Sequence, residues 1–130
     1  MKVGTGFGGT WLTEVPASIQ KAESLGYDFA STPETQHDSM LAAAVAAAHS
    51  TKIGIQTSVT IAFPRSPMVL AMEAWDLQHM TKGRFAIGLG SQVKGHNINR
   101  FSTEWPGAPA TRMKEYIRMM RAVFHSFRTG

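Results

Sequence analysis

The chain has 130 residues, of which 43% are hydrophobic and 17% are charged, and its formal net charge is +4. This length suits one domain over residues 1–130. The sequence has no run of 18 apolar residues and no signal-peptide pattern after Met1, so we expect a cytoplasmic protein without membrane partners. The absence of cysteine excludes disulfides and thiolate metal sites, and the scattered basic residues argue against a nucleic-acid partner while suiting small anionic ligands.

Four times along the chain, a short apolar or glycine-bounded run precedes a helical pattern. The first run is "KVGTGFG", which indicates a short strand. We expect the helix after it to begin at an N-cap Thr13, to carry Pro16 in its first turn and to stop at Gly26. Its apolar residues recur at helical spacing at Val15, Ile19, Ala22 and Leu25.

The second and third units repeat this order. The strand candidate "YDFAST" precedes the alanine-rich helix "MLAAAVAAAH", for which Asp38 or Ser39 is the expected N-cap. The β-branched run "KIGIQTSVTIAF" precedes the helix "MVLAMEAWDLQHM", which Ser66 and Pro67 open.

The fourth strand candidate is "RFAIGLG", followed by a long polar loop over residues 91–109 and a final helix "TRMKEYIRMMRAVFHSF". Strands therefore start at intervals of about 25 to 32 residues, the size of a βα unit, which predicts a parallel sheet. Helices would cover one face of the sheet in a barrel and both faces in a doubly wound fold.

The expected carboxyl ends of the strands read "GFGGTW", "STPETQHD", "TSVTIAFPRS" and "GLGSQVKGHN". All four are rich in glycine, hydroxyl, amide or ionisable side chains, whereas the opposite ends resemble ordinary turns. Ligands bind at the carboxyl ends of parallel strands in both architectures, so the sequence places a site there.

Two histidines, His37 and His96, fall in these strand-end loops near Glu34 and Gln92. They are candidates for proton transfer or ligand contact, and the alternative is a histidine held in a loop for structural reasons. Trp105 in the long loop is a candidate lid residue or a packing residue. No HxH or HExxH pattern is present, so no metal site is expected.

The blocks "TPETQHD", "TSVTIAFPRSPMVLA", "AWDLQHMTKGRF" and "RFAIGLGSQVKGHNINRF" together resemble the luciferase-like flavin monooxygenase superfamily. Within it they resemble a mycobacterial and actinobacterial branch expected to use coenzyme F420. The resemblance implies an α/β fold in which the four βα units and their parallel strands form the first half of a (β/α)8 TIM barrel. Members are more than twice as long, which implies a homo-oligomer or completion by a second half-barrel chain.

The same resemblance implies an oxidoreductase that transfers hydride between reduced F420, or alternatively FMN, and a small organic substrate. The strand-end glycines Gly88 and Gly90 would be bare because a planar ring lies against the backbone. The implied cofactor contacts are Glu34, Ser58, Val59, Gly90, Ser91 and Gln92, and the Ser58–Val59 peptide is expected to be cis. The implied catalytic residues are His37 and His96. The implied substrate contacts are Asn97 and Trp105.

The sequence departs from the family pattern at two positions, and two other functions are open alternatives to the oxidoreductase. Many relatives carry an acid followed directly by histidine, whereas Thr35 follows Glu34 here, and Gln92 stands where some sugar dehydrogenases carry a glutamate. A sugar-phosphate substrate is therefore not supported. The alternatives are a non-catalytic half-barrel remnant or assembly subunit, and a doubly wound ligand-binding module without redox chemistry.

Overall fold

The computed structural model describes residues 1–130 and divides the chain into two compact units. Unit 1 comprises residues 1–60 and 76–89, and unit 2 comprises residues 61–75 and 90–130. The helix α3 (Pro67–Met80) contributes to both. None of the helices combines the length and apolar character that a membrane span requires.

Unit 1 contains a four-stranded sheet in the order β1-β2-β3-β5, and every pairing in it is parallel, as predicted. The strands are β1 (Gly4–Gly6), β2 (Phe29–Thr32), β3 (Gly54–Thr57) and β5 (Phe85–Ala86). The third and fourth predicted strands are each interrupted, and the chain resumes as β4 (Thr60–Ile61) and β6 (Leu89–Gly90), which pair as a second, two-stranded sheet.

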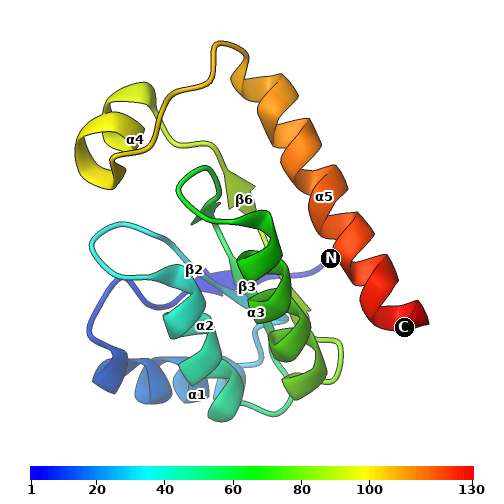
Figure 1. The fold of residues 1–130 in the computed structure, drawn as a ribbon. Helices are drawn as coiled ribbons and strands as arrows, with labels where there is room; N and C mark the ends of the chain where they lie inside the picture. Colours follow the sequence, from blue (N-terminus) through cyan, green and yellow to red (C-terminus); the bar gives the residue numbers. More distant parts are fainter. The chain divides into compact units, whose positions relative to one another are not determined.

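Helices α1 (Val15–Ser24) and α2 (Ser39–Ala48) pack side by side, and α2 contacts β2 and β3 (Figure 1). The N-cap of α2 is Asp38, whose carboxylate accepts the backbone N–H groups of Met40 and Leu41. The predicted cap Thr13 is wrong, because residues Leu12–Glu14 form a 3-10 turn (η1) that leads into α1. Leu25 is also not part of the core. It has 64% of its surface exposed, because α1 ends at Ser24 and Leu25 is its C-cap, directly before the left-handed Gly26.

The strand register separates two faces of the sheet in unit 1. One face is buried and carries Ala30, Thr32, Ile55 and Thr57. The other face carries Phe29, Ser31, Gln56 and Ala86, which are partly or fully exposed. On this face a Cβ at Gly4 would lie 2.2 Å from the Phe29 ring, so the missing side chain makes room for the aromatic ring of the neighbouring strand.

Unit 2 contains a helix that the sequence did not predict. Residues Lys94–Phe101 form α4 inside the segment expected to be a loop over 91–109. The stretch "KGHNINRF" contains a glycine and two asparagines, which have low helix propensity, and no side chain caps the start of the helix. Helix propensity alone therefore does not predict α4.

The final helix, α5 (Pro109–Thr129), matches the prediction closely. Its buried residues are Tyr116, Met120 and Val123, and Phe124 stacks on Trp75 of α3 with 6.2 Å between ring centroids. The Tyr116 hydroxyl donates to the carbonyl oxygen of Arg65 at 3.0 Å. Burial raises the pKa of Tyr116 to about 12.

Glu23, near the end of α1, clamps the segment that leads into β3. Its carboxylate accepts the backbone N–H groups of Thr51, Lys52 and Ile53 at 2.9, 2.6 and 2.8 Å, and also the Thr51 hydroxyl at 3.1 Å. Partial burial on its own raises the pKa of this carboxyl. The hydrogen bonds to its charged form outweigh that effect and lower the pKa to about 2.

We expect Glu23→Gln to lower the free energy of unfolding by about 1 to 3 kcal/mol at pH 7, because a neutral amide replaces an acceptor of several charge-assisted hydrogen bonds. The pKa of Glu23 in the folded chain lies below the ordinary glutamate pKa of 4.5, so the stabilisation is complete above pH 4.5 and is lost as the pH falls toward 2. Urea denaturation of both proteins at pH 7 and pH 3 measures this. Glu115→Gln, at an exposed position of α5, is the control and should change neither value.

Candidate functional site

A chain of side-chain hydrogen bonds joins two strand-end segments of unit 1. The hydroxyl of Ser39, which is fully buried, donates to Glu34 Oε2 at 2.6 Å. Thr60 Oγ1 lies 2.9 Å from the same hydroxyl oxygen. Because Ser39 has one hydroxyl proton and gives it to the carboxylate, Thr60 is the donor in its contact with Ser39, and it shares its proton with Met40 Sδ at 3.6 Å. The structure thus joins Glu34 through Ser39 to Thr60, which directly follows the Ser58–Val59 segment.

The Ser58–Val59 peptide is cis, which confirms that expectation. The Ser58 N–H donates to the Thr32 carbonyl at 2.8 Å, and the Thr60 N–H donates to the Gly88 carbonyl at 2.7 Å. The side chains of Ser58 and Val59 are exposed, between the buried Thr57 and Thr60. This segment therefore offers an accessible surface at the carboxyl end of β3.

Gly88 has a structural reason to lack a side chain. A Cβ there would lie 2.2 Å from the Thr57 carbonyl oxygen. The Thr57 hydroxyl also donates to the Gly88 carbonyl at 3.0 Å and accepts the Gly88 N–H at 3.0 Å. The close approach of the β3 backbone by itself accounts for a glycine at residue 88.

We expect Gly88→Ala to destabilise the chain by about 2 kcal/mol or more, since its Cβ would clash with a backbone atom that cannot swing aside. Gly95→Ala is the matched control. Nothing lies within 4 Å of a Cβ at Gly95, which is helical, so this change should stabilise α4 by up to about 1 kcal/mol. Thermal melts followed by circular dichroism compare the two, and equal melting temperatures would contradict the packing role of Gly88.

His37 lies in the turn between β2 and α2. Its ring meets Trp11 edge-on, with 5.0 Å between centroids and an interplanar angle of 66°. It lines a hollow of about 420 Å³, together with Trp11, Leu12, Thr13, Gln36, Asp38 and Leu41. No hydrogen bond within the protein engages a His37 ring nitrogen, and none joins it to Glu34, so the imidazole is available to a ligand.

In unit 2, Asn97 fixes the segment that follows β6. Its side chain is fully buried, and Nδ2 donates to the carbonyls of Ser91 at 2.9 Å and Val93 at 3.1 Å. Gln92 has a left-handed backbone, and its side-chain oxygen accepts the N–H of Val93 at 3.0 Å. The Asn97 amide nitrogen and the Gln92 side-chain oxygen thus bind the protein backbone, at two residues that the sequence assigned to the substrate and to the cofactor.

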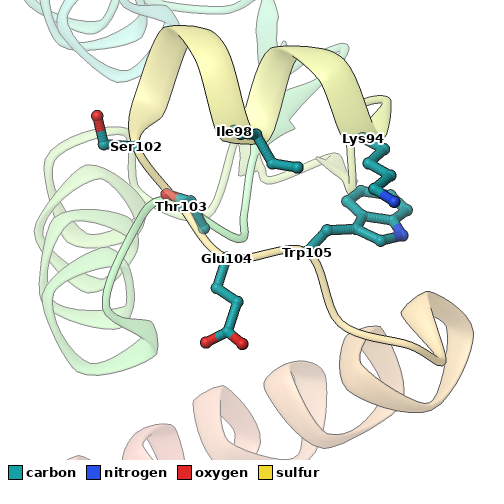
Figure 2. Close-up of a pocket in the computed structure, with 6 residues that line it drawn as sticks. All are labelled: Lys94, Ile98, Ser102, Thr103, Glu104 and Trp105. Atoms are coloured by element: carbon teal, nitrogen blue, oxygen red, sulfur yellow. The ribbon is translucent and has the colours of Figure 1, made fainter.

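The other two predicted residues of unit 2 have different surroundings. His96 is exposed on α4 rather than in a loop. Trp105 is half-buried and meets Phe63 edge-on with 6.0 Å between centroids, and the guanidinium of Arg112 lies 5.7 Å from the Phe63 ring. Trp105 also lines a pocket of about 480 Å³ with Lys94, Ile98, Ser102, Thr103 and Glu104 (Figure 2).

The sequence did not predict that the buried hydroxyls of Ser39, Thr57 and Thr60 form the hydrogen bonds that hold these strand ends. Thr57 and Thr60 stand on either side of Ser58–Val59, but hydroxyl residues at strand ends are too common for this spacing to indicate such a role. No cluster of three or more histidine, cysteine or acidic side chains in the structure could hold a metal ion.

Comparison with known families decides the classification. The model of the luciferase-like monooxygenase family matches residues 3–129. The chain belongs to this family. The match spans nearly the whole sequence and agrees with the resemblance of the strand-end blocks.

Two mycobacterial relatives extend the comparison. The uncharacterized protein Rv1360 of Mycobacterium tuberculosis is 40% identical over 108 residues, which are 83% of this chain and 32% of that protein. The uncharacterized protein Rv0953c of the same organism is 26% identical over 121 residues, covering 86% of this chain and 40% of its own length. The luciferase-like chain thus spans about a third to two fifths of these relatives.

Solved structures show the same fold. A monooxygenase, RslO1, from Streptomyces bottropensis aligns with a TM-score of 0.79 at 20% identity, over 93% of this chain and 42% of its own. The F420-dependent tetrahydromethanopterin reductase of Methanopyrus kandleri aligns with a TM-score of 0.76 at 21% identity, over 92% and 39%. The chain therefore has the α/β fold of the N-terminal part of a luciferase-like TIM barrel.

Proposed function

We propose that this chain is the cofactor-positioning part of an oxidoreductase that transfers hydride between a reduced flavin-type cofactor, F420 or FMN, and a small organic substrate. The observation that carries the proposal is the hydrogen-bonded chain Glu34–Ser39–Thr60 beside the exposed Ser58–Val59 segment. Related folds supply the cofactor class: one neighbour is an F420-dependent reductase, and a 3,6-diketocamphane monooxygenase constituent from Pseudomonas putida was solved in complex with FMN. The family match crosses both units, which supports treating residues 1–130 as one luciferase-like domain.

The residues of unit 1 fit the planar part of such a cofactor. Val59, with 41% of its surface exposed at the end of β3, offers an apolar side chain for a ring face. Glu34 offers a carboxylate held in place by the buried Ser39. The bound cofactor would supply the hydride, and these residues would orient it. The contacts of Gly90, Ser91 and Gln92 with the ring remain predictions.

Two side chains of unit 1 can serve proton chemistry. A carboxylate fixed by a buried hydroxyl accepts a hydrogen bond from a ligand with little rearrangement, which suits Glu34 to orientation. His37 has free ring nitrogens and is steadied by its contact with Trp11, so it can hold a proton and deliver it to a substrate atom. His96 takes no part in this scheme.

Fluorescence titration with F420 and with FMN tests the proposal. We expect one of them to bind, and Gly90→Val to weaken that binding by about tenfold or more, because a branched side chain would fill the space assigned to the ring. Gly107→Val is the control, since a Cβ at Gly107 meets nothing within 4 Å. If neither cofactor binds, the chain is the non-catalytic remnant instead.

We further propose that the sheet is completed by another polypeptide, either a second copy or a chain with the remaining strands. β1 and β5 are the two edges of the sheet of unit 1, and edge strands have unpaired backbone groups. The family members span more than twice this length. A cytoplasmic location, where thiols stay reduced, agrees with the absence of cysteine.

We expect the isolated chain to associate at micromolar concentration. Size-exclusion chromatography coupled to light scattering should give a mass that is a multiple of 14.2 kDa. A stable 14.2 kDa monomer with a cooperative melt would contradict self-association and leave completion by a different chain.

A further inference from the structure

We propose that the pocket between α4 and the segment 102–105 binds the apolar body of a monocarboxylate substrate, with Lys94 pairing with its carboxylate. The inference rests on the proposed function, because it names the substrate class of that oxidoreductase. All the residues that carry it belong to unit 2.

A sharp turn after α4 builds the pocket. Ser102 adopts a left-handed backbone, and its N–H and that of Thr103 both donate to the Asn97 carbonyl. The chain reverses here, and residues 102–105 run back beside the helix (Figure 2). Lys94 and Ile98 are one helical turn apart on one face of α4, so both line the hollow of about 480 Å³. This volume lies in the range of small-molecule sites.

The pocket has an apolar middle. Ile98 is 44% exposed although it is aliphatic, and Figure 2 shows its side chain extending from α4 toward the 103–105 segment. The indole of Trp105 forms a further wall and is anchored by its edge-on contact with Phe63. A ligand with an aromatic or aliphatic body would bury both surfaces.

The charges of the pocket are separated. Lys94 and Trp105 line the same pocket, whereas the carboxylate of Glu104 points away from α4 (Figure 2). Neither charge has an ion-pair or hydrogen-bond partner in the protein. Lys94 is exposed, and its ammonium can form a charge-assisted hydrogen bond with a ligand carboxylate. A second anionic group directed at Glu104 would be repelled, so the pocket favours one carboxylate over two.

The pocket is joined to the segment that the sequence assigns to the cofactor. Asn97 lies on α4 between Lys94 and Ile98, and its amide donates to the Ser91 carbonyl at 2.9 Å. A substrate in the pocket would therefore lie against a helix that is fixed to the Gly90–Gln92 segment.

Isothermal titration calorimetry on the whole chain without cofactor tests the inference, with phenylacetate, its neutral amide phenylacetamide, and the dianion 1,4-phenylenediacetate as probes. We expect phenylacetate to bind about tenfold or more tightly than either other probe. Lys94→Gln should abolish the preference for the acid over the amide. The control Lys114→Gln, at an exposed position of α5, should keep it.

Glu104→Gln gives a second, independent readout, because it should raise the affinity for 1,4-phenylenediacetate and leave phenylacetate nearly unchanged. Equal binding of phenylacetate and phenylacetamide to the parent chain would overturn the inference, as would a preference that survives Lys94→Gln. These titrations contain no flavin, so they are independent of the cofactor titration. If a cofactor binds but phenylacetate shows no preference, the substrate class alone is refuted. If phenylacetate binds as expected but neither cofactor binds, the redox function alone is refuted.

Discussion

The close approach of Gly88 to Thr57 is the contact on which the strand ends of unit 1 depend. The Gly88 carbonyl accepts the Thr57 hydroxyl at 3.0 Å and the Thr60 N–H at 2.7 Å, so one oxygen holds the chain on both sides of Ser58–Val59. A side chain at residue 88 would push these strands apart. With Thr57 and Thr60 held inward, the two residues between them are directed to the surface, where they form the accessible part of the proposed cofactor site.

The buried hydroxyls then decide which groups remain for a ligand. Thr57 is satisfied by Gly88, and Ser39 is satisfied between Thr60 and Glu34. Buried polar groups without partners are costly, so these hydroxyls serve the fold first. In unit 1 the His37 imidazole, which has no hydrogen-bond partner in the protein, and the exposed apolar side chain of Val59 are available to a ligand.

The sequence predicted the regular elements well because their signals are local. Alternation of short strands with helices of 3.6-residue period identified the parallel sheet, and the Asp38 cap and Gly26 stop follow from backbone chemistry that needs no tertiary contacts. Helix α4 was missed because its residues favour a helix only when the fold supports them. Buried Asn97 supplies part of that support through the carbonyls of Ser91 and Val93.

The candidate site was predicted less completely, for a physical reason. Residue type indicates what a side chain can bind but not whether the protein already uses it. Gln92 and Asn97 look like ligand contacts in a polar loop, yet both donate to or accept from the neighbouring backbone. Glu34 could be placed beside Thr60 only through Ser39, whose role depends on the packing of α2 against the sheet.

Asn97 positions neighbouring segments while contributing little to the free energy of folding. Its amide donates two hydrogen bonds, each of which contributes about 1 kcal/mol, while its buried Oδ1 has no partner and costs about 1 to 3 kcal/mol. The net contribution to the free energy of folding is therefore near zero. What the residue provides is position, since it fixes Ser91 and α4 to each other. The segment assigned to the cofactor and the wall of the proposed substrate pocket are therefore joined through one buried side chain, and the proposed hydride transfer would require that kind of fixed distance.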